Sequence, residues 1–168
     1  MIKNVFSSLT GIVMMLLICT CFSKEAKAEE SIIKSIEDYN KVLAINPNDA
    51  EAYFNRGNVY GQKGDFNHAI EDFNKALAIN PNDADAYYNR GGAYYDKDDY
   101  DRAIEDYNKA IYIDPNNTDV YNNRAKAWYY KKQYDKAWAD VKHCRKAGGT
   151  PESAFISALE EASGRKEK

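Results

Sequence analysis

Chemically reactive side chains are few in this chain, and their types and spacing do not match a known catalytic or metal-binding pattern. The two histidines, His68 and His143, stand outside any zinc-ligand spacing or catalytic triad. The nucleotide-binding P-loop and the motifs H-E-x-x-H, G-x-S-x-G and C-x-x-C do not occur. We therefore expect no catalytic residue, no metal ligand and no cofactor.

An acidic run at residues 96–101, with the sequence DKDDYD, has the oxygen-rich side chains that bind Ca²⁺. Tyr100 stands at one of the places where a calcium loop needs an oxygen ligand, and the glycine of such a loop is missing. We interpret the run as a solvated junction between two helices.

Length and charge narrow the classes of function further. The 168 residues are enough for one ordinary domain. Lys and Arg number 23 against 26 Asp and Glu, a formal net charge of −3, so the basic surface typical of nucleic-acid-binding proteins is missing. We expect no nucleic-acid partner.

Residues 1–28 have the composition of an export signal. A lysine at position 3 precedes an uncharged apolar stretch that includes IVMMLLI, and the A-x-A site at residues 26–28 follows. The sequence predicts a signal peptide cleaved after Ala28 and a protein exported to the bacterial periplasm or the cell exterior. The alternatives are an uncleaved anchor and lipidation at Cys19 or Cys21, whose preceding residues fit an acceptor site poorly.

The remainder of the chain repeats every 34 residues. Residues 50–83 and 84–117 agree at 19 of 34 positions without a gap, and residues 118–151 continue the register more loosely. In each unit, apolar residues recur at three- and four-residue spacing over two stretches, which predicts two amphipathic helices. We expect Asp49, Asp83 and Asn117 to cap the first helices.

The repeated residues resemble the tetratricopeptide repeat family, whose pattern is W-x2-L-G-x2-Y, then A-x3-F, then P. Small residues stand where the two helices of a unit cross, and prolines end the second helices. These positions are Gly57, Ala69, Pro81, Gly91, Ala103, Pro115 and Ala137.

The resemblance implies an all-α fold, a right-handed superhelical solenoid of stacked antiparallel helix pairs. It divides residues 29–168 into an N-terminal half repeat at 29–49, repeats at 50–83, 84–117 and 118–151, and a capping helix at 151–164. We expect Phe155, Leu159 and Ala162 on the inner face of that capping helix. Cys144 takes the place of Ala76 and Ala110, which indicates a small buried residue.

Charged residues recur at places where the family pattern is apolar. Arg56, Arg90 and Arg124 replace its leucine, and acids recur in one phase at Asp38, Asp72, Asp106 and Asp140. We predict that each arginine bonds an aspartate on an adjacent second helix, because an unpaired cation at a helix interface is costly. The alternative is an exposed arginine of little energetic weight.

In the family, the first helices of successive repeats line a concave groove that holds a peptide or partner segment. The resemblance places these residues in the groove: Phe54, Asn55, Asn58, Tyr88, Asn89, Tyr95, Asn123, Lys126, Tyr129 and Tyr130. Asparagines at the repeat spacing suit a bound backbone, although they also suit an ordinary solvated surface. Because Lys126 is the only base among these residues, we expect acidic C-terminal peptides to bind the groove poorly.

The sequence thus predicts a non-enzymatic, exported adaptor or scaffold that holds a protein or peptide partner in its groove. The alternative is a structural subunit that self-associates, or docks on a membrane-associated complex, through its helical ends.

Overall fold

The computed structural model of the protein describes residues 29–166. The export signal, its cleavage after Ala28 and the lipidation alternative at Cys19 or Cys21 fall outside the described residues and stay predictions. Among residues 29–166, none of the helices has the length and apolar character needed to span a membrane.

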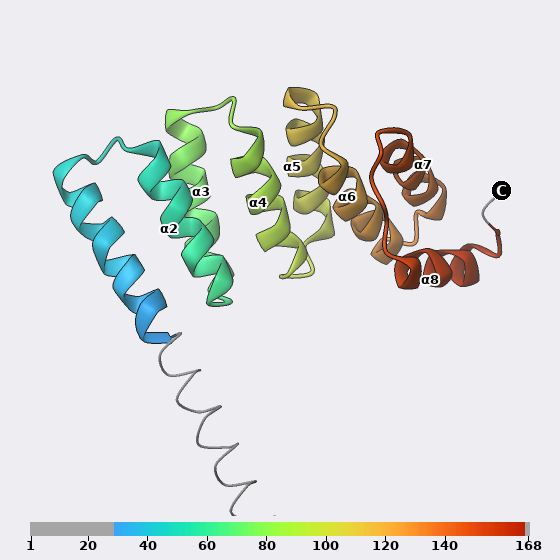
Figure 1. The fold of residues 1–168 in the computed structure, drawn as a ribbon, viewed down its shortest axis with the longest axis horizontal. Helices are drawn as coiled ribbons and strands as arrows, with labels where there is room; N and C mark the ends of the chain where they lie inside the picture. Colours follow the sequence, from blue (N-terminus) through green and yellow to red (C-terminus); the bar gives the residue numbers. More distant parts are fainter. Residues whose placement is uncertain (1–28, 167–168) are drawn as a thin grey trace, which may run out of the picture.

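Helices make up the regular structure of residues 29–166, as the sequence predicts (Figure 1). After a helix over residues 29–45, the elements are α2 (Ala50–Gln62), α3 (Phe66–Ile79), α4 (Ala84–Tyr95), α5 (Tyr100–Ile113), α6 (Thr118–Tyr130), α7 (Tyr134–Lys146) and α8 (Ser153–Ser163). Consecutive helices pair as α2 with α3, α4 with α5 and α6 with α7.

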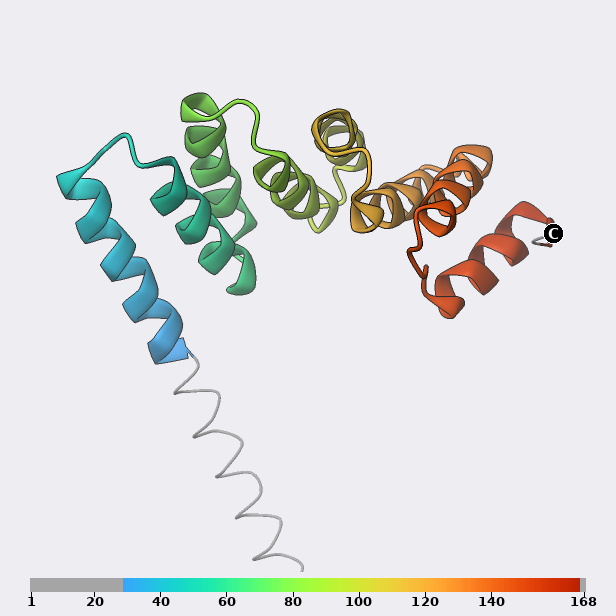
Figure 2. The same ribbon diagram turned by 45° about the horizontal axis from the view of Figure 1, so that its top comes forward.

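The helix pairs stack side by side into an arch. Figure 2 shows α3, α5 and α7 in the outer row and α2, α4 and α6 in the inner row. The buried residues between 29 and 166 form three clusters, which join α3 to α4, α5 to α6, and α6 and α7 to α8. The cluster between α5 and α6 contains Tyr107, which is 1% exposed. This arrangement confirms the all-α solenoid.

Aspartate and asparagine side chains fix where most helices begin. Asp49 and Asp83 accept hydrogen bonds from backbone N–H groups in the first turns of α2 and α4, and Asn117 does so for α6. These contacts confirm the predicted caps. Among the second helices, α3 and α5 have the same kind of cap, whereas Gln133 at the start of α7 gives none.

The third repeat ends differently from the first two because glycines replace its proline. Gly148 adopts a φ of +90°, which terminates α7. The backbone N–H of Gly149 donates to the backbone carbonyl oxygen of Cys144. A Cβ at Gly149 would lie 2.5 Å from Cys144 Sγ and 2.7 Å from Thr118 Cβ. Only a glycine lets the chain pass this close to the buried cysteine.

Helix α8 covers the last repeat, with an inner face that differs in part from the predicted one. Leu159 is fully buried and Phe155 is half-buried, but Ala162 is exposed and Ile156 is buried instead. Ser163, one residue further on, accepts a hydrogen bond from Trp138 Nε1 at 3.1 Å. The face of α8 that packs toward α7 is therefore formed by Ile156, Leu159 and Ser163.

Glycines at the helix crossings explain the close packing within a repeat. A Cβ at Gly57 would lie 2.8 Å from the Phe73 ring, and one at Gly91 would lie 2.8 Å from the Tyr107 ring and 3.2 Å from the Ala103 carbonyl oxygen. Any side chain would push the second helix away, because buried rings and backbone cannot yield freely.

Arginine–aspartate pairs tie the two helices of each repeat together. Each arginine donates from Nε and Nη2 to both oxygens of the carboxylate sixteen residues later, at 2.6–2.8 Å. Each aspartate is 3% exposed. The pairs are Arg56 with Asp72, Arg90 with Asp106, and Arg124 with Asp140, which confirms the predicted pairing in bidentate form.

The same guanidinium groups reach the preceding second helix. Nη1 donates to an asparagine side chain at 2.5–2.6 Å, and these acceptors are Asn40, Asn74 and Asn108. A tyrosine three residues before each arginine lies under the guanidinium, at 5.4–5.6 Å from the ring centroid. One side chain therefore links three helices in two successive units.

We call the three arginine–aspartate pairs, with their asparagine acceptors, the ladder. Asp38 does not belong to this ladder, although it recurs at the same place in the repeat. Its carboxylate is exposed and accepts a hydrogen bond from Lys41 at 2.9 Å. The residue sixteen positions earlier is Phe22, so the sequence provides no arginine for it.

We expect Gly91→Ala to lower the free energy of unfolding by about 1–3 kcal/mol, because the new methyl group overpacks the crossing with Tyr107. Gly92→Ala is the matched control, since a Cβ there meets nothing within 4 Å. It should stabilise the helix by up to about 1 kcal/mol. Urea unfolding followed by circular dichroism measures both, and equal effects of the two substitutions would contradict this packing.

We expect Arg90→Leu to lower the free energy of unfolding by about 3 kcal/mol, because the Asp106 carboxylate stays buried without its partner. Adding Asp106→Leu should recover most of the loss. Arg102→Leu serves as the control and should cost less than about 1 kcal/mol, because the Arg102–Asp99 pair is exposed. Thermal melts compare the variants, and stabilisation by Arg90→Leu with undiminished cooperativity would contradict this role.

Candidate interaction groove

A cavity of about 360 Å³ opens on the inner row of helices, and we call it the groove cavity. Its walls come from three successive first helices and the end of α4, while two phenylalanines of α3 contribute beneath them. The lining residues are Asn58, Gly61, Gln62, Phe66, Phe73, Tyr88, Asn89, Gly92, Ala93, Asp96 and Asn123. One ligand here could contact all three repeats.

Two hydrogen bonds between neighbouring repeats orient the polar groups of the groove cavity. Asn89 Nδ2 donates to Asn58 Oδ1 at 2.8 Å, and Asn123 Nδ2 donates to the Tyr88 hydroxyl at 2.9 Å. Burial raises the pKa of Tyr88, so its hydroxyl stays protonated at neutral pH. The groove cavity therefore presents amide groups and a neutral hydroxyl whose positions the fold already sets.

Four of the ten residues that the resemblance assigned to the groove line this cavity: Asn58, Tyr88, Asn89 and Asn123. Asn55 lies on α2 outside it. The ring of Phe54 instead packs beside Phe73, with centroids 5.9 Å apart. The repeat spacing places the predicted residues on the first helices, and packing decides which of them reach the cavity.

The remaining predicted residues contact other parts of the protein. Tyr95 and Tyr130 form an aromatic cluster with Tyr100, in which the rings of Tyr100 and Tyr130 stack with centroids 5.1 Å apart. Tyr129 packs against Phe155 of α8, at 5.9 Å between centroids. These contacts join neighbouring units, although Tyr130 remains 54% exposed.

The one base among the predicted groove residues is neutralised within the protein. Lys126 Nζ donates to Glu152 at 2.8 Å, just before α8 begins. The groove cavity itself has an acid, Asp96, at the C-terminal end of α4. Loss of solvent around this carboxylate raises its pKa. The electrostatic character of the groove is therefore neutral to acidic.

The sequence analysis did not assign Gln62, Gly92 and Asp96 to the inner face. Gly92 and Asp96 each have a feature in the sequence that could have identified them. Gly92 follows the crossing residue Gly91, and the crossing requires only one glycine. Asp96 places a negative charge at a helix C-terminus, which the helix dipole disfavours. Each departs from what the helix alone prefers.

The histidines and the cysteine have structural surroundings. His68 bonds Asp65 at 2.7 Å and stacks on Tyr60, and His143 stacks on Tyr121. Cys144 is 2% exposed, and burial raises the pKa of its thiol, as expected of an unreactive cysteine. In residues 29–166, no group of three or more His, Cys, Asp or Glu side chains could hold a metal ion.

The acidic run is the turn between α4 and α5. Asp98 adopts a φ of +59° and accepts a hydrogen bond from Tyr100, while Asp99 caps α5 and pairs with Arg102. Asp101 pairs with Lys131 of the next repeat. These contacts agree with a helix junction rather than a calcium loop.

Comparison with known proteins supports the same fold. A family model for the TPR repeat matches residues 29–64 and 57–98, and one for the tetratricopeptide repeat matches residues 84–117. Together they span residues 29–117, more than half of the chain. A comparison with curated protein sequences found no match.

Several solved structures share the fold. A crystal structure of MamA is 26% identical, with a TM-score of 0.73, and the match covers 82% of each chain. The Arabidopsis OM64 TPR domain is 26% identical, with a TM-score of 0.60 over 67% of this chain and 91% of that one. The first TPR of Spaghetti (RPAP3), bound to the HSP90 peptide SRMEEVD, is 22% identical, with a TM-score of 0.63 over 68% of this chain and 90% of that one.

Tetratricopeptide-repeat domains are protein-interaction modules and typically have no catalytic activity. The 34-residue period, the helix pairs with small residues at their crossings and the matching family models show that this chain belongs to the tetratricopeptide-repeat family.

Proposed function

We propose that this protein is an exported adaptor that holds an extended segment of a partner protein in the groove cavity. The observation that carries the proposal is the set of oriented amide and hydroxyl groups contributed by α2, α4 and α6. Export is supported by the signal pattern of residues 1–28.

Amide groups suit a ligand that is recognised through its backbone. An asparagine side chain both donates and accepts, so it can pair with the N–H and C=O groups of an extended segment of varied sequence. Because the Asn58–Asn89 and Tyr88–Asn123 bonds already hold these side chains, a partner meets a site with little rotamer freedom left to lose. The Tyr88 ring adds apolar contact area.

The charges favour a neutral or basic partner segment. Asp96 contributes an acid to the groove cavity, and Lys126 is already paired with Glu152. An acidic C-terminal peptide would therefore meet no available cation among the residues that line this cavity. The HSP90 peptide SRMEEVD bound by the Spaghetti domain is acidic, so the groove cavity does not fit that ligand.

A second candidate function is a structural subunit that associates through its ends. The helix over residues 29–45 leaves apolar side chains exposed at the N-terminal end of the arch: Ile33 at 44%, Val42 at 41% and Ile45 at 87%. Such side chains favour contact with another copy or with a membrane-associated complex.

We expect Gly92→Leu to abolish binding of the partner, because the new side chain enters the groove cavity from a position where a Cβ meets nothing. Ala78→Leu, on the exposed side of α3, is the control of matched size. The measurement is co-purification from native cells after light cross-linking, with wild-type protein and both variants. A partner kept by wild type and Ala78→Leu but lost by Gly92→Leu supports the adaptor. If all three bring down only copies of the protein, or one unchanged complex, the end-association function replaces it.

We expect Asp96→Asn to weaken partner capture and to stabilise the free protein. A carboxyl whose pKa is raised on folding costs stability above that pKa, and the cost disappears once the pH falls below the ordinary value of 3.8. The variant should therefore melt at a higher temperature than wild type at neutral pH, and the difference should vanish below pH 3.8. Thermal melts across pH measure this, and a destabilised variant at neutral pH would contradict a functional role for the acid.

A further inference from the structure

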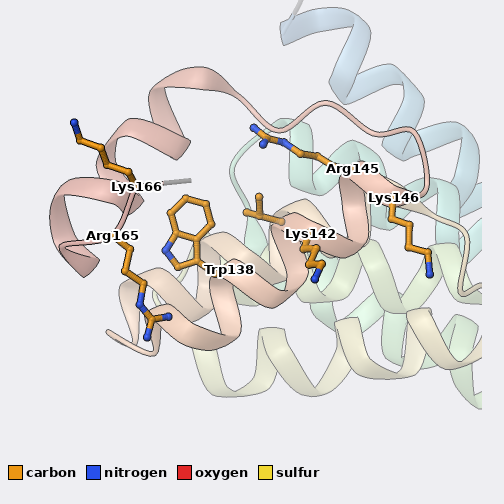
Figure 3. Close-up of a pocket in the computed structure, with 7 residues that line it drawn as sticks. Trp138, Lys142, Arg145, Lys146, Arg165 and Lys166 are labelled. Atoms are coloured by element: carbon orange, nitrogen blue, oxygen red, sulfur yellow. The ribbon is translucent and has the colours of Figure 1, made fainter. Parts of the chain in front are cut away.

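A second and larger cavity, of about 900 Å³, lies beside α7 at the C-terminal end of the arch, away from the groove cavity. Its apolar part consists of Trp138 and of Val141, which is 1% exposed. Figure 3 shows the Trp138 ring in the space between α7 and α8, with Lys142, Arg145 and Lys146 projecting from α7. We call it the terminal cavity.

The terminal cavity gathers positive charge in a chain whose overall charge is negative. Of its seven described lining residues five are basic, namely Lys142, Arg145, Lys146, Arg165 and Lys166, and none is acidic. Arg165 already pairs with Asp135 and Arg145 also interacts within the protein, so a ligand meets chiefly the charges of the three lysines. The whole chain has a formal net charge of −3. Several cations around one hollow raise the local concentration of anions, so the terminal cavity attracts a ligand with more than one negative charge.

The repeat register shows that one of these cations, Arg145, replaces an apolar residue. Arg145 stands 34 residues after Ile111 and 68 after Leu77, and Leu77 is 6% exposed where the next repeat covers it. A further apolar repeat cannot cover Arg145 in the same way, because its charge would have to leave water. At the end of the last repeat, the surface therefore has a positive charge where the earlier repeats have an apolar side chain, and a positive charge favours binding of an anion.

Two contacts between α7 and the C-terminal segment hold the Trp138 ring in a position where it can contact an apolar side chain of a ligand. Trp138 Nε1 donates to Ser163 of α8 at 3.1 Å, and Arg165 pairs with Asp135 at 2.5 Å. The indole is half-buried, and the cations around it are exposed. An aromatic side chain flanked by basic side chains favours binding of a peptide that has both apolar and acidic side chains.

We propose that the terminal cavity binds an acidic peptide segment of a partner protein, with one large apolar side chain of that segment placed against Trp138. The recess favours a peptide over a flat anionic membrane, because only a narrow chain brings an apolar group to the indole between α7 and α8. The site is separate from the groove cavity, so the groove can still reject acidic C-terminal peptides.

The probe is a fluorescein-labelled peptide of glutamates around a central phenylalanine, with both ends blocked so that no terminal carboxylate contributes. Fluorescence anisotropy should show binding to wild-type protein that weakens steeply with added NaCl. Lys142→Gln with Lys146→Gln should weaken binding about tenfold, whereas Lys34→Gln with Lys63→Gln, of equal net charge, should leave it unchanged. A peptide with serine in place of phenylalanine should bind more weakly.

Tryptophan emission reports the apolar contact directly. The chain has two tryptophans, so Trp128→Phe leaves Trp138 as the single emitter. Binding of the phenylalanine peptide should shift this emission, while Gly92→Leu should not affect the titration. Equal loss in both lysine pairs, or loss in Gly92→Leu, would overturn the assignment.

Two other occupants are tested in parallel. If vesicles of anionic phospholipid bind through Lys142 and Lys146 while the peptide does not, the ligand is a membrane and the proposal is wrong. If sedimentation shows self-association that the same lysine substitutions abolish, and the peptide does not bind, the occupant is a second copy and the proposal is again wrong. Because the groove test uses Gly92→Leu and a cellular partner, either proposal can fail without the other.

Discussion

A partly buried guanidinium that joins three helices, bound to a buried carboxylate, is the interaction on which the rest of the structure depends. A leucine at this place would suffice for packing, and a buried ion pair alone contributes little net stability. Its effect here is geometric, because the planar donor group fixes both the carboxylate of its own repeat and the asparagine of the preceding one. Repetition of these bonds in three successive units sets one spacing between neighbours.

The groove cavity follows from that spacing. Arg90 and Gly91 face the second helices, so the other side of α4 is left to Tyr88, Asn89 and Gly92. With the distance between first helices set by the ladder, an asparagine on one helix reaches the helix of the preceding unit, as Asn89 does with Asn58. The polar lining is thus a product of the same constraint that holds the solenoid together.

The sequence predicts the repeat, the helix pairs, the caps and the arginine–aspartate pairs, because each depends on residues at a fixed spacing. The groove is predicted only in part, since spacing gives the phase of a side chain but not its hydrogen-bond partner. Tyr95 and Tyr130 share the predicted face yet pack on Tyr100, and Lys126 reaches Glu152 from outside the repeat. The terminal cavity could not be foreseen, because it depends on how α8 crosses α7.

Gln133 gives α7 no side-chain cap, and Asp38 has no arginine, so both ends of the ladder have weaker local bonding than its middle. In a solenoid, each unit gains stability only from its immediate neighbours. Opening motions should therefore start at either end and travel inward, with the amides of α4 and α5 exchanging with solvent last. Under stretching, the outer repeats should therefore separate first, from both ends, while the central repeat stays folded.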